Sequence, residues 1–449
     1  MTKTLKQRAV RSGTWVIFGH LLSQGLRLGS NLVLTRLLVP EMFGVMAIVT
    51  VIMGGLAMFS DVGLLQNIVQ SKRGEDPDYL NTAWTIQIIR GFLIFLFALL
   101  LSVALHFFGN MGVLSVGTVY GNPDLPLFLA VVSMRSIVAG FNSIHILLLN
   151  RRLMLGKLTV VELISQVAGL IFMLSWAWFQ RDIWALIYGG FVSVFLKLIL
   201  SHSMNLGERC RIHWDKQAVY EIIHFGKWVF GASVFTFFAG QGDRIILGGL
   251  ITSNELGVYS VAFFLAMAFK GIVRKIISSV FYPVLSEVVR ERPQELKRIF
   301  YKIRSNVDSL IMVVVGLLAS TGHVIVEFLY DDRYQYAGWV FEVLVLSTVF
   351  LGITIAGSCL LALGDSKSVM QLTAASSIFL FISLPIAFHY FGFRGAVIAI
   401  ALNAIVELPI LFYKMKQYDF LDWAKELRFW PLFVLSYSGG ICGTSLLGI

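Results

Sequence analysis

Uninterrupted apolar runs of about 20 residues recur along the whole 449-residue chain, and they limit its fold more than any other feature. A helix of that length crosses the hydrocarbon core of a bilayer. The strands of a transmembrane barrel alternate over only about 10 residues, and these runs do not alternate. Hydrophobic residues make up 57% of the chain and charged residues only 14%, unlike a soluble domain. The sequence therefore predicts an all-α, polytopic membrane protein.

Twelve transmembrane spans are predicted from the apolar runs and the polar turns between them. They cover residues 13–36, 42–66, 82–107, 125–149, 158–179, 183–205, 226–251, 255–281, 305–329, 339–363, 368–390 and 394–413. A further apolar run at 429–447 could form a thirteenth span. The first run is too long for the core of a signal peptide and lacks a small-residue cleavage site, so no cleavable signal is expected.

The lysines and arginines of the loops are concentrated on one side of the predicted membrane. Twenty-three of them lie in the N-terminal tail, the even-numbered loops and the segment after the twelfth span. The intervening loops hold only Arg181, Arg333 and Arg394. By the positive-inside rule this asymmetry places the N-terminus in the cytoplasm. It also accounts for the net charge of +10 without a nucleic-acid partner.

Sequence motifs for a cofactor, a metal ion or covalent catalysis are not found. Cys210, Cys359 and Cys442 are isolated and match neither a metal-binding spacing nor a disulfide framework. The chain has no phosphate-binding loop, zinc motif or nucleophile elbow. We therefore expect a protein that is not an enzyme and that needs no cofactor.

The two halves of the chain repeat each other at an offset of 213 residues. The segment GTWVIFG at residue 13 aligns with GKWVFGA at residue 226, and Gly44 then falls on Gly257. An offset of six spans predicts two six-helix lobes in the same orientation, as in transporters whose site lies near the midplane between repeats. The predicted parts are an N-terminal lobe at 1–210, a cytoplasmic linker at 211–225, a C-terminal lobe at 226–415, and a cytoplasmic segment with an extra helix at 416–449.

Several cations lie deep within predicted spans, where each opposes insertion by roughly 2.5–3.5 kcal/mol. A structural ion pair between helices could explain any one of them, but the deep acids are too few to pair them all. The excess of positive charge indicates a wet cavity or an anionic ligand. The candidate binding residues are these cations and their polar neighbours on the same helix faces: Gln24, Arg27, Asn31, Arg90, Arg135, Gln241, Arg244 and Lys270.

Asp243 and Arg244 are neighbours in an otherwise apolar segment. Adjacent residues point about 100° apart on a helix, so the two side chains are not each other's natural partners. We expect Arg244 to face the cavity and Asp243 to bond a neighbouring helix or to titrate, although the reverse assignment stays open. Glu407, two residues before Pro409, is the other deep acid. Asp243 and Glu407 are therefore the candidates for ion coupling.

Four long segments resemble the polysaccharide transporter family, the Wzx-type oligosaccharide flippases of the superfamily that also contains multidrug extruders. They are RLLVPEMFGVMAIVTVIMGGLAMFSDVGLLQNIVQ, NPDLPLFLAVVSMRSIVAGFNSI, FGKWVFGASVFTFFAGQGDRIILGGLITSNELGVYSVA and FYPVLSEVVRERPQELKRIFYKIR, at residues 36–70, 122–144, 225–262 and 281–304. The resemblance implies a V-shaped pair of six-helix lobes around a central cavity. Members often have 12 or 14 spans. It also implies that Arg27 and Arg244 engage a pyrophosphate.

The resemblance further implies transport of an undecaprenyl-diphosphate-linked oligosaccharide repeat unit across the bacterial inner membrane for exopolysaccharide, capsule or O-antigen synthesis. The partners would then be this lipid-linked sugar, membrane lipid, and a polysaccharide polymerase with its chain-length protein. Alternating access would be coupled to H⁺ or Na⁺ antiport. Two alternatives stay open: a multidrug extruder of the same superfamily, although deep cations would repel cationic drugs, and a membrane-embedded polysaccharide polymerase or ligase, although the periplasmic loops are short.

Overall fold

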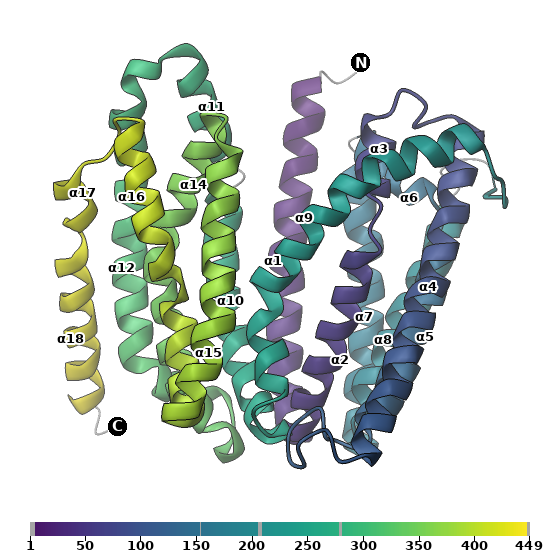
Figure 1. Cartoon of the computed structure of the whole chain (residues 1–449), viewed down its shortest axis with the longest axis horizontal. Coiled ribbons are helices and arrows are strands. Elements are labelled where there is room, and N and C mark those ends of the chain that lie inside the picture. The colour runs from purple at the N-terminus through teal and green to yellow at the C-terminus, as the bar shows by residue number, and fades with distance from the viewer. Residues whose placement is uncertain (1–4, 153, 205–208, 278–280, 447–449) are drawn as a thin grey trace. The chain divides into compact units, whose positions relative to one another are not determined.

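The computed structural model describes residues 5–152, 154–204, 209–277 and 281–446, and every regular element among them is helical (Figure 1). This confirms the predicted all-α class. The chain forms two compact units, a first unit at Met1–Phe237 and a second unit at Phe238–Ile449. The division lies inside a continuous helix, about one-third of the way from its C-terminal end, whereas the sequence pattern placed it before residue 226. The reason is local packing: the first part of that helix contacts the first unit.

Among the described residues, the first half of the chain contains eight helices, and a ninth crosses into the second unit. These are α1 (Leu5–Leu37), α2 (Pro40–Phe59), α3 (Leu64–Gln70), α4 (Pro77–Asn110), α5 (Leu125–Gly140), α6 (His145–Arg151), α7 (Leu155–Gln180), α8 (Trp184–Ser203) and α9 (Lys216–Gly248). Within the first unit α9 lies against the end of α2, where the rings of Phe59 and Phe237 meet edge to face with centroids 4.9 Å apart.

The second half follows the same plan with more interruptions. Its elements are α10 (Ser253–Ile276), α11 (Tyr282–Glu291), η2 (Pro293–Glu295), α12 (Leu296–Leu329), η3 (Asp332–Tyr334), α13 (Tyr336–Leu346), η4 (Ser347–Leu351), α14 (Gly352–Ala362), α15 (Ser366–Leu402), η5 (Asn403–Val406), α16 (Glu407–Gln417), α17 (Trp423–Leu427) and α18 (Trp430–Leu446).

Each of the twelve predicted spans falls largely on helix. Within the described residues, eight helical stretches are long and apolar enough to cross a membrane. A ninth is added if α5 and α6, which meet at a 69° bend, count as one span. One stretch, 366–417, contains both of the spans predicted at 368–390 and 394–413. The chain is therefore a multi-pass membrane protein.

The internal repeat is visible in the lengths of the helices. Helices α1 and α9 both have 33 residues, and α4 and α12 both have 34. Helix α2 begins at Pro40 and α10 at Ser253, which is the offset of 213 that aligns the two sequences. The starts use different chemistry: α2 has proline in its first turn, and α10 has a capping box in which Thr252 and Glu255 bond each other's backbone amides.

Gly392 divides α15 into the two arms of a helical hairpin. Its backbone angles, φ 61° and ψ −154°, leave the helical region, and only glycine adopts them readily. The arms return to each other: the Tyr418 hydroxyl donates to Asp365 at 3.0 Å, and Lys414 lies 3.6 Å from the same carboxylate. The predicted break between residues 390 and 394 is confirmed.

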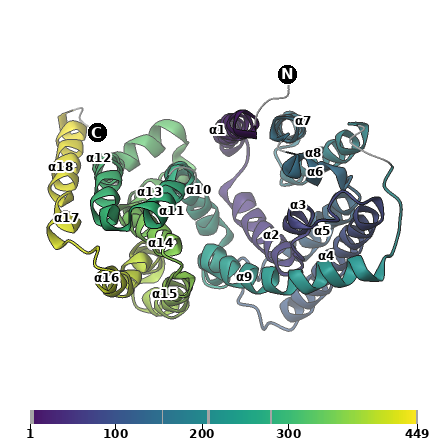
Figure 2. The ribbon, with the colours of Figure 1, turned by 90° about the horizontal axis from the view of Figure 1, so that it is seen from above.

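The run predicted as an additional span is helix α18, which packs along α12 (Figures 1 and 2). The hydroxyl of Ser436 donates to the Val313 carbonyl oxygen at 2.6 Å. At the preceding helix α17, Glu426 accepts from Arg304 at 2.6 Å, and Arg304 also donates to Asp308 at 2.7 Å. The C-terminal segment is therefore held to the second unit by a buried ion network as well as by apolar packing.

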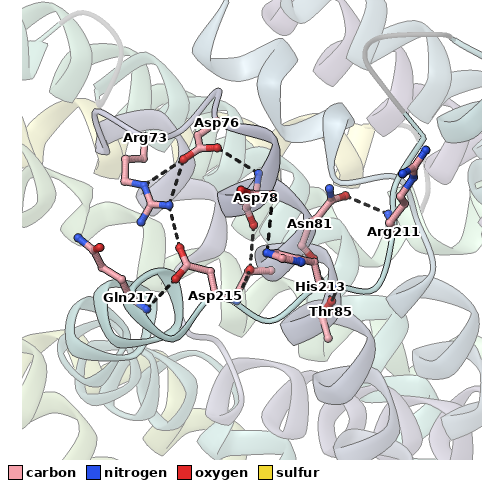
Figure 3. A network of polar contacts seen from close by, with 10 residues as sticks. Arg73, Asp76, Asp78, Asn81, Thr85, Arg211, His213, Asp215 and Gln217 are labelled. Atoms are coloured by element: carbon pink, nitrogen blue, oxygen red, sulfur yellow. Dashed lines mark hydrogen bonds and ion pairs between the residues drawn. The ribbon is translucent and has the colours of Figure 1, made fainter.

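The segment between α8 and α9, predicted as a cytoplasmic linker, is fastened to the first turns of α4 (Figure 3). Alternate backbone amides of an extended stretch donate to side chains on one face of α4. The three hydrogen bonds are Arg211 to Asn81 at 2.9 Å, His213 to Thr85 at 3.1 Å, and Asp215 to Thr82 at 3.0 Å. Every second residue of the extended segment therefore donates to a side chain on the same face of helix α4. We call residues 211–215 the strap.

Arg73 forms ion pairs at the C-terminal end of the strap. Its guanidinium contacts Asp215 at 2.8 Å and Asp76 at 3.0 Å, and Glu221 on α9 lies 3.7 Å away. The hydrogen bond from Arg73 holds the pKa of Asp215 below its usual range, and the two carboxylates raise the pKa of Arg73. This contact fixes where α9 begins, and α9 carries Asp243 and Arg244.

Candidate functional site

The second unit contains a pocket of about 430 Å³ whose charged residues come from three separate helices. Asp243 comes from α9, Lys270 and Arg274 from α10, and Glu407 from the first turn of α16. The breaks between α13 and α14 and before α16 place polar groups on its wall, including Ser347 and Asn403 at the starts of 3₁₀ turns. The pocket therefore brings together three of the predicted site residues, Asp243, Lys270 and Glu407.

Asp243 is held by a neighbouring helix. Its carboxylate accepts a hydrogen bond of 2.5 Å from the hydroxyl of Tyr259 on α10. Asp243 is only 6% exposed and Tyr259 is fully buried. A buried carboxylate needs such a donor because its desolvation is otherwise uncompensated. The predicted bond between Asp243 and another helix is present, but Tyr259 could not be identified as the partner from sequence spacing alone.

Arg244 points away from Asp243 and is not among the pocket-lining residues. Its guanidinium carbon lies 4.0 Å from the ring centroid of Phe263, and it donates to Gln241 at 3.1 Å. Its Nε is buried without a hydrogen-bond partner in the described part of the chain. Within the second unit the two neighbouring charges thus have separate surroundings, as the 100° rotation per residue requires.

Lys270 and Glu407 line the same pocket and carry opposite charges. The ammonium of Lys270 lies 3.5 Å from the Ser347 hydroxyl, and the charges of Glu407 and Asp243 both act on it. Glu407 is under the influence of Lys270 and Arg274, with the Ser376 hydroxyl in hydrogen-bonding reach. The side-chain oxygen of Asn403 is buried in the pocket wall with no partner in the described residues. The pocket can therefore bind a charged or strongly polar group.

Helix α1 carries the predicted residues of the first unit. Arg27 is exposed, and among the described residues its side chain has no hydrogen-bond or ion-pair partner. Gln24 and Asn31 are half-buried on the same helix. The adjacent Ser23 instead pairs with Gln166 on α7, at 2.6 Å. One side of α1 is therefore fixed to the unit while Arg27 remains available to a ligand.

Arg90 and Arg135 have protein partners inside the first unit. Arg90 caps the C-terminal end of α2, donating to the Ala57 carbonyl at 2.6 Å and to the Ser60 hydroxyl at 3.1 Å. Arg135 donates to two carbonyls in the first turns of α8, Leu186 at 3.2 Å and Ile187 at 2.6 Å. Arg90 completes a helix end and so has a structural reason to be there. Arg135 contacts the N-terminal turn of α8, and its Nε is buried without a hydrogen-bond partner in the described residues. The predicted binding role of both arginines remains a prediction.

Three signals in the sequence were too weak to identify parts of this site. Arg274 lies one turn after Lys270, toward the end of the span predicted at 255–281. Tyr259 looks like any core aromatic residue. Ser347 and Asn403 are single polar residues in apolar runs, and only the breaks in α13–α14 and before α16 bring them to the pocket. Among the described residues no three His, Cys, Asp or Glu side chains are grouped to hold a metal ion.

Two repeated halves of apolar helices with ionisable side chains at membrane depth define a helical membrane protein of the transporter class. The chain belongs to the polysaccharide biosynthesis protein family, whose pattern matches residues 33–338. The family that the sequence segments resembled is thereby confirmed.

Named relatives cover most of the chain at low identity. The lipopolysaccharide biosynthesis protein WzxC of Escherichia coli (strain K12) is 21% identical over 98% of this chain and 89% of its own length. The succinoglycan biosynthesis transport protein ExoT of Rhizobium meliloti (strain 1021) is 22% identical over 77% of this chain and 68% of its own. Among solved structures, the lipid II flippase MurJ in an inward closed conformation matches with a TM-score of 0.67. It shares 13% identity over 97% of this chain and 99% of MurJ, so the likeness concerns the fold.

Proposed function

We propose that this protein is a flippase that translocates an undecaprenyl-diphosphate-linked oligosaccharide repeat unit for exopolysaccharide, capsule or O-antigen synthesis. It is a transporter and not an enzyme. Membership of the polysaccharide biosynthesis family supports the substrate class, since two relatives of that kind are named for lipopolysaccharide biosynthesis and for succinoglycan transport. The all-helical, multi-pass fold with a repeat supports the mode of action.

The observation that carries the proposal is the set of cations at membrane depth that lack a full complement of protein partners. Arg27 has none in the described residues, the Nε of Arg244 is unbonded, and Lys270 faces a pocket. A diphosphate offers several oxygen acceptors, and arginine binds phosphate through paired hydrogen bonds. The lipid tail can stay in the bilayer while basic side chains of this kind bind the charged headgroup as it crosses.

The orientation and location are part of the proposal. The excess of lysine and arginine in alternate loops supports a cytoplasmic N-terminus in the bacterial inner membrane. The substrate would then enter from the cytoplasmic side and leave toward a polymerase and a chain-length protein on the other. Alternating access moves the headgroup, and coupling to H⁺ or Na⁺ antiport through Asp243 or Glu407 resets the carrier.

Deletion of the gene followed by lipid extraction tests the proposal. We expect loss of the surface polysaccharide and accumulation of lipid-linked repeat units on the cytoplasmic face. The sidedness can be read with an enzyme or lectin added to intact and to opened spheroplasts. Unchanged polymer without an accumulated intermediate would rule out this function. Accumulation of full-length repeat units on the outer face would instead assign the protein to a later step, polymerisation or ligation.

A further inference from the structure

The pocket of the second unit already contains as much positive as negative charge. Two acids, Asp243 and Glu407, and two cations, Lys270 and Arg274, are the charged groups among its described lining residues. The two acids come from different helices, α9 and α16, whereas the two cations lie one turn apart on α10. An ion-coupling site attracts a free cation through its negative charge. In this pocket that negative charge is already neutralised by the basic side chains of the protein itself.

Lys270 is the cation that lies within range of both acids. Its ammonium is 3.5 Å from Ser347, and the charges of Glu407 and Asp243 both act on it. Within the described residues it forms no ion pair shorter than 4 Å with either carboxylate, although all three side chains line the same pocket. A lysine stem has four flexible carbons, which lets the ammonium move between the acids without leaving the pocket.

The described lining of this pocket offers a sodium ion little uncompensated negative charge. Hard cations need several oxygen ligands, commonly including carboxylates whose charge is not compensated. One oxygen of Asp243 is bonded to Tyr259, and Glu407 is influenced by Lys270 and Arg274 together. The other nearby charge, Arg244, faces Phe263 and adds no negative potential. The neutral oxygens of the described lining can coordinate a cation but do not supply the missing negative charge; they belong to Ser347, Thr354, Ser358, Thr373, Ser376 and Asn403.

We infer that Lys270 is a tethered cation that occupies, between Asp243 and Glu407, the place that a free sodium ion would need. The pocket therefore binds no sodium. This inference rests on the proposed function where it concerns coupling: if the carrier is reset through this pocket, the coupling ion is a proton. The statement about sodium binding itself concerns the protein alone and needs no lipid substrate.

Melting temperatures of the purified full-length protein in detergent test the inference. The wild type and Lys270→Met are compared in sodium chloride and in choline chloride at equal ionic strength. We expect no difference between the salts for the wild type. For Lys270→Met we expect a sodium-specific rise of about 2 °C or more that grows with the logarithm of the sodium concentration, because ligand binding stabilises the folded state. Where Lys270→Met does not fold, Lys270→Gln serves the same comparison.

Two further variants control the assignment. Lys367→Met removes an exposed lysine from the start of α15, outside the pocket, and should behave like the wild type. Lys270→Met combined with Glu407→Gln should lose the sodium effect, because the uncompensated acid is gone. A sodium-specific rise in the wild type, or none in folded Lys270 variants, overturns the inference. It is also overturned if Lys367→Met responds to sodium or if the double variant keeps the response. None of these outcomes bears on whether lipid-linked sugar is flipped.

Discussion

The deep cations of the two units differ in the groups that they contact. In the first unit Arg90 and Arg135 donate to backbone carbonyls at the ends of helices α2 and α8. In the second unit Lys270 and Arg274 face a pocket that also contains two acids. The same sequence signal, a basic residue in an apolar run, therefore has two physical origins. In the first unit the cations donate to backbone carbonyls, whereas in the second unit they face a pocket in which they can exchange partners.

The first helices of the two halves extend this comparison. Arg27 on α1 is exposed without a partner in the described residues, and Arg244 on α9 is partly engaged by Phe263 and Gln241. Neither completes a helix end. If a cation's surroundings decide its role, substitutions of Arg27 and Arg244 should change transport, whereas disturbance of Arg135 should change stability.

The largest effect is expected for Arg27→Ala combined with Arg244→Ala. Each charge-assisted contact with phosphate contributes about 1.5–3 kcal/mol, so loss of two should slow flipping by about 100-fold or more. The measurement is surface polysaccharide per molecule of membrane-inserted protein in a deletion strain. Arg290→Ala, which removes an exposed arginine on α11, is the matched control. Full complementation by the double variant would remove Arg27 and Arg244 from the proposed site while leaving the family unchanged.

A smaller effect is expected for the acids of the pocket. Asp243→Asn and Glu407→Gln remove the groups that can exchange a proton, so flipping should continue but lose much of its dependence on the ion gradient. Flipping in inverted vesicles, with and without an uncoupler, measures this. Ser376→Ala removes a neutral neighbour of Glu407 and is the control. An unaltered gradient dependence in both acid variants would exclude Asp243 and Glu407 as coupling residues.

Arg135 should affect stability and not transport. A β-carbon at Gly190 would collide with the Arg135 guanidinium, so Gly190→Ala should lower the free energy of unfolding by about 1–3 kcal/mol. Adding Arg135→Met removes the collision and should restore part of that loss, whatever the effect of Arg135→Met alone. Thermal unfolding of all four proteins gives the coupling between the two sites. Additive effects would show that the contact does not exist in the folded protein.

The smallest effect is expected at the strap. Arg73 lowers the pKa of Asp215, so this carboxylate stabilises the fold above its unfolded pKa of about 3.9, and the contribution is lost as the pH falls through the lower folded value. The melting temperature of Asp215→Asn should therefore lie slightly below that of the wild type near neutral pH. The two should converge below about pH 4. A difference that does not change with pH would indicate a steric cause instead.

Much of the fold follows from one-dimensional patterns. Apolar runs locate the helices because burial in lipid depends on composition, and the break at Gly392 is marked by its residue type. Tyr259, Ser347 and Asn403 could not be assigned to a site, because their place in the pocket depends on how broken helices pack. The strap was predicted only as part of a cytoplasmic linker at 211–225. The hydrogen bonds from its backbone amides depend on which side chains of α4 lie beside it, not on its own residues.

Gly392 also has a consequence for how the protein is made. The chain reverses there within an almost continuous apolar stretch, so this one backbone conformation decides that Lys414 returns to the level of Asp365. A residue that favoured an unbroken helix would leave the stretch 393–417 with no return path across the bilayer. In the proposed orientation, the basic segment that follows would then lie on the non-cytoplasmic side. If the protein has the proposed orientation, the backbone conformation of this single glycine and the positive-inside rule favour the same topology for the C-terminal region.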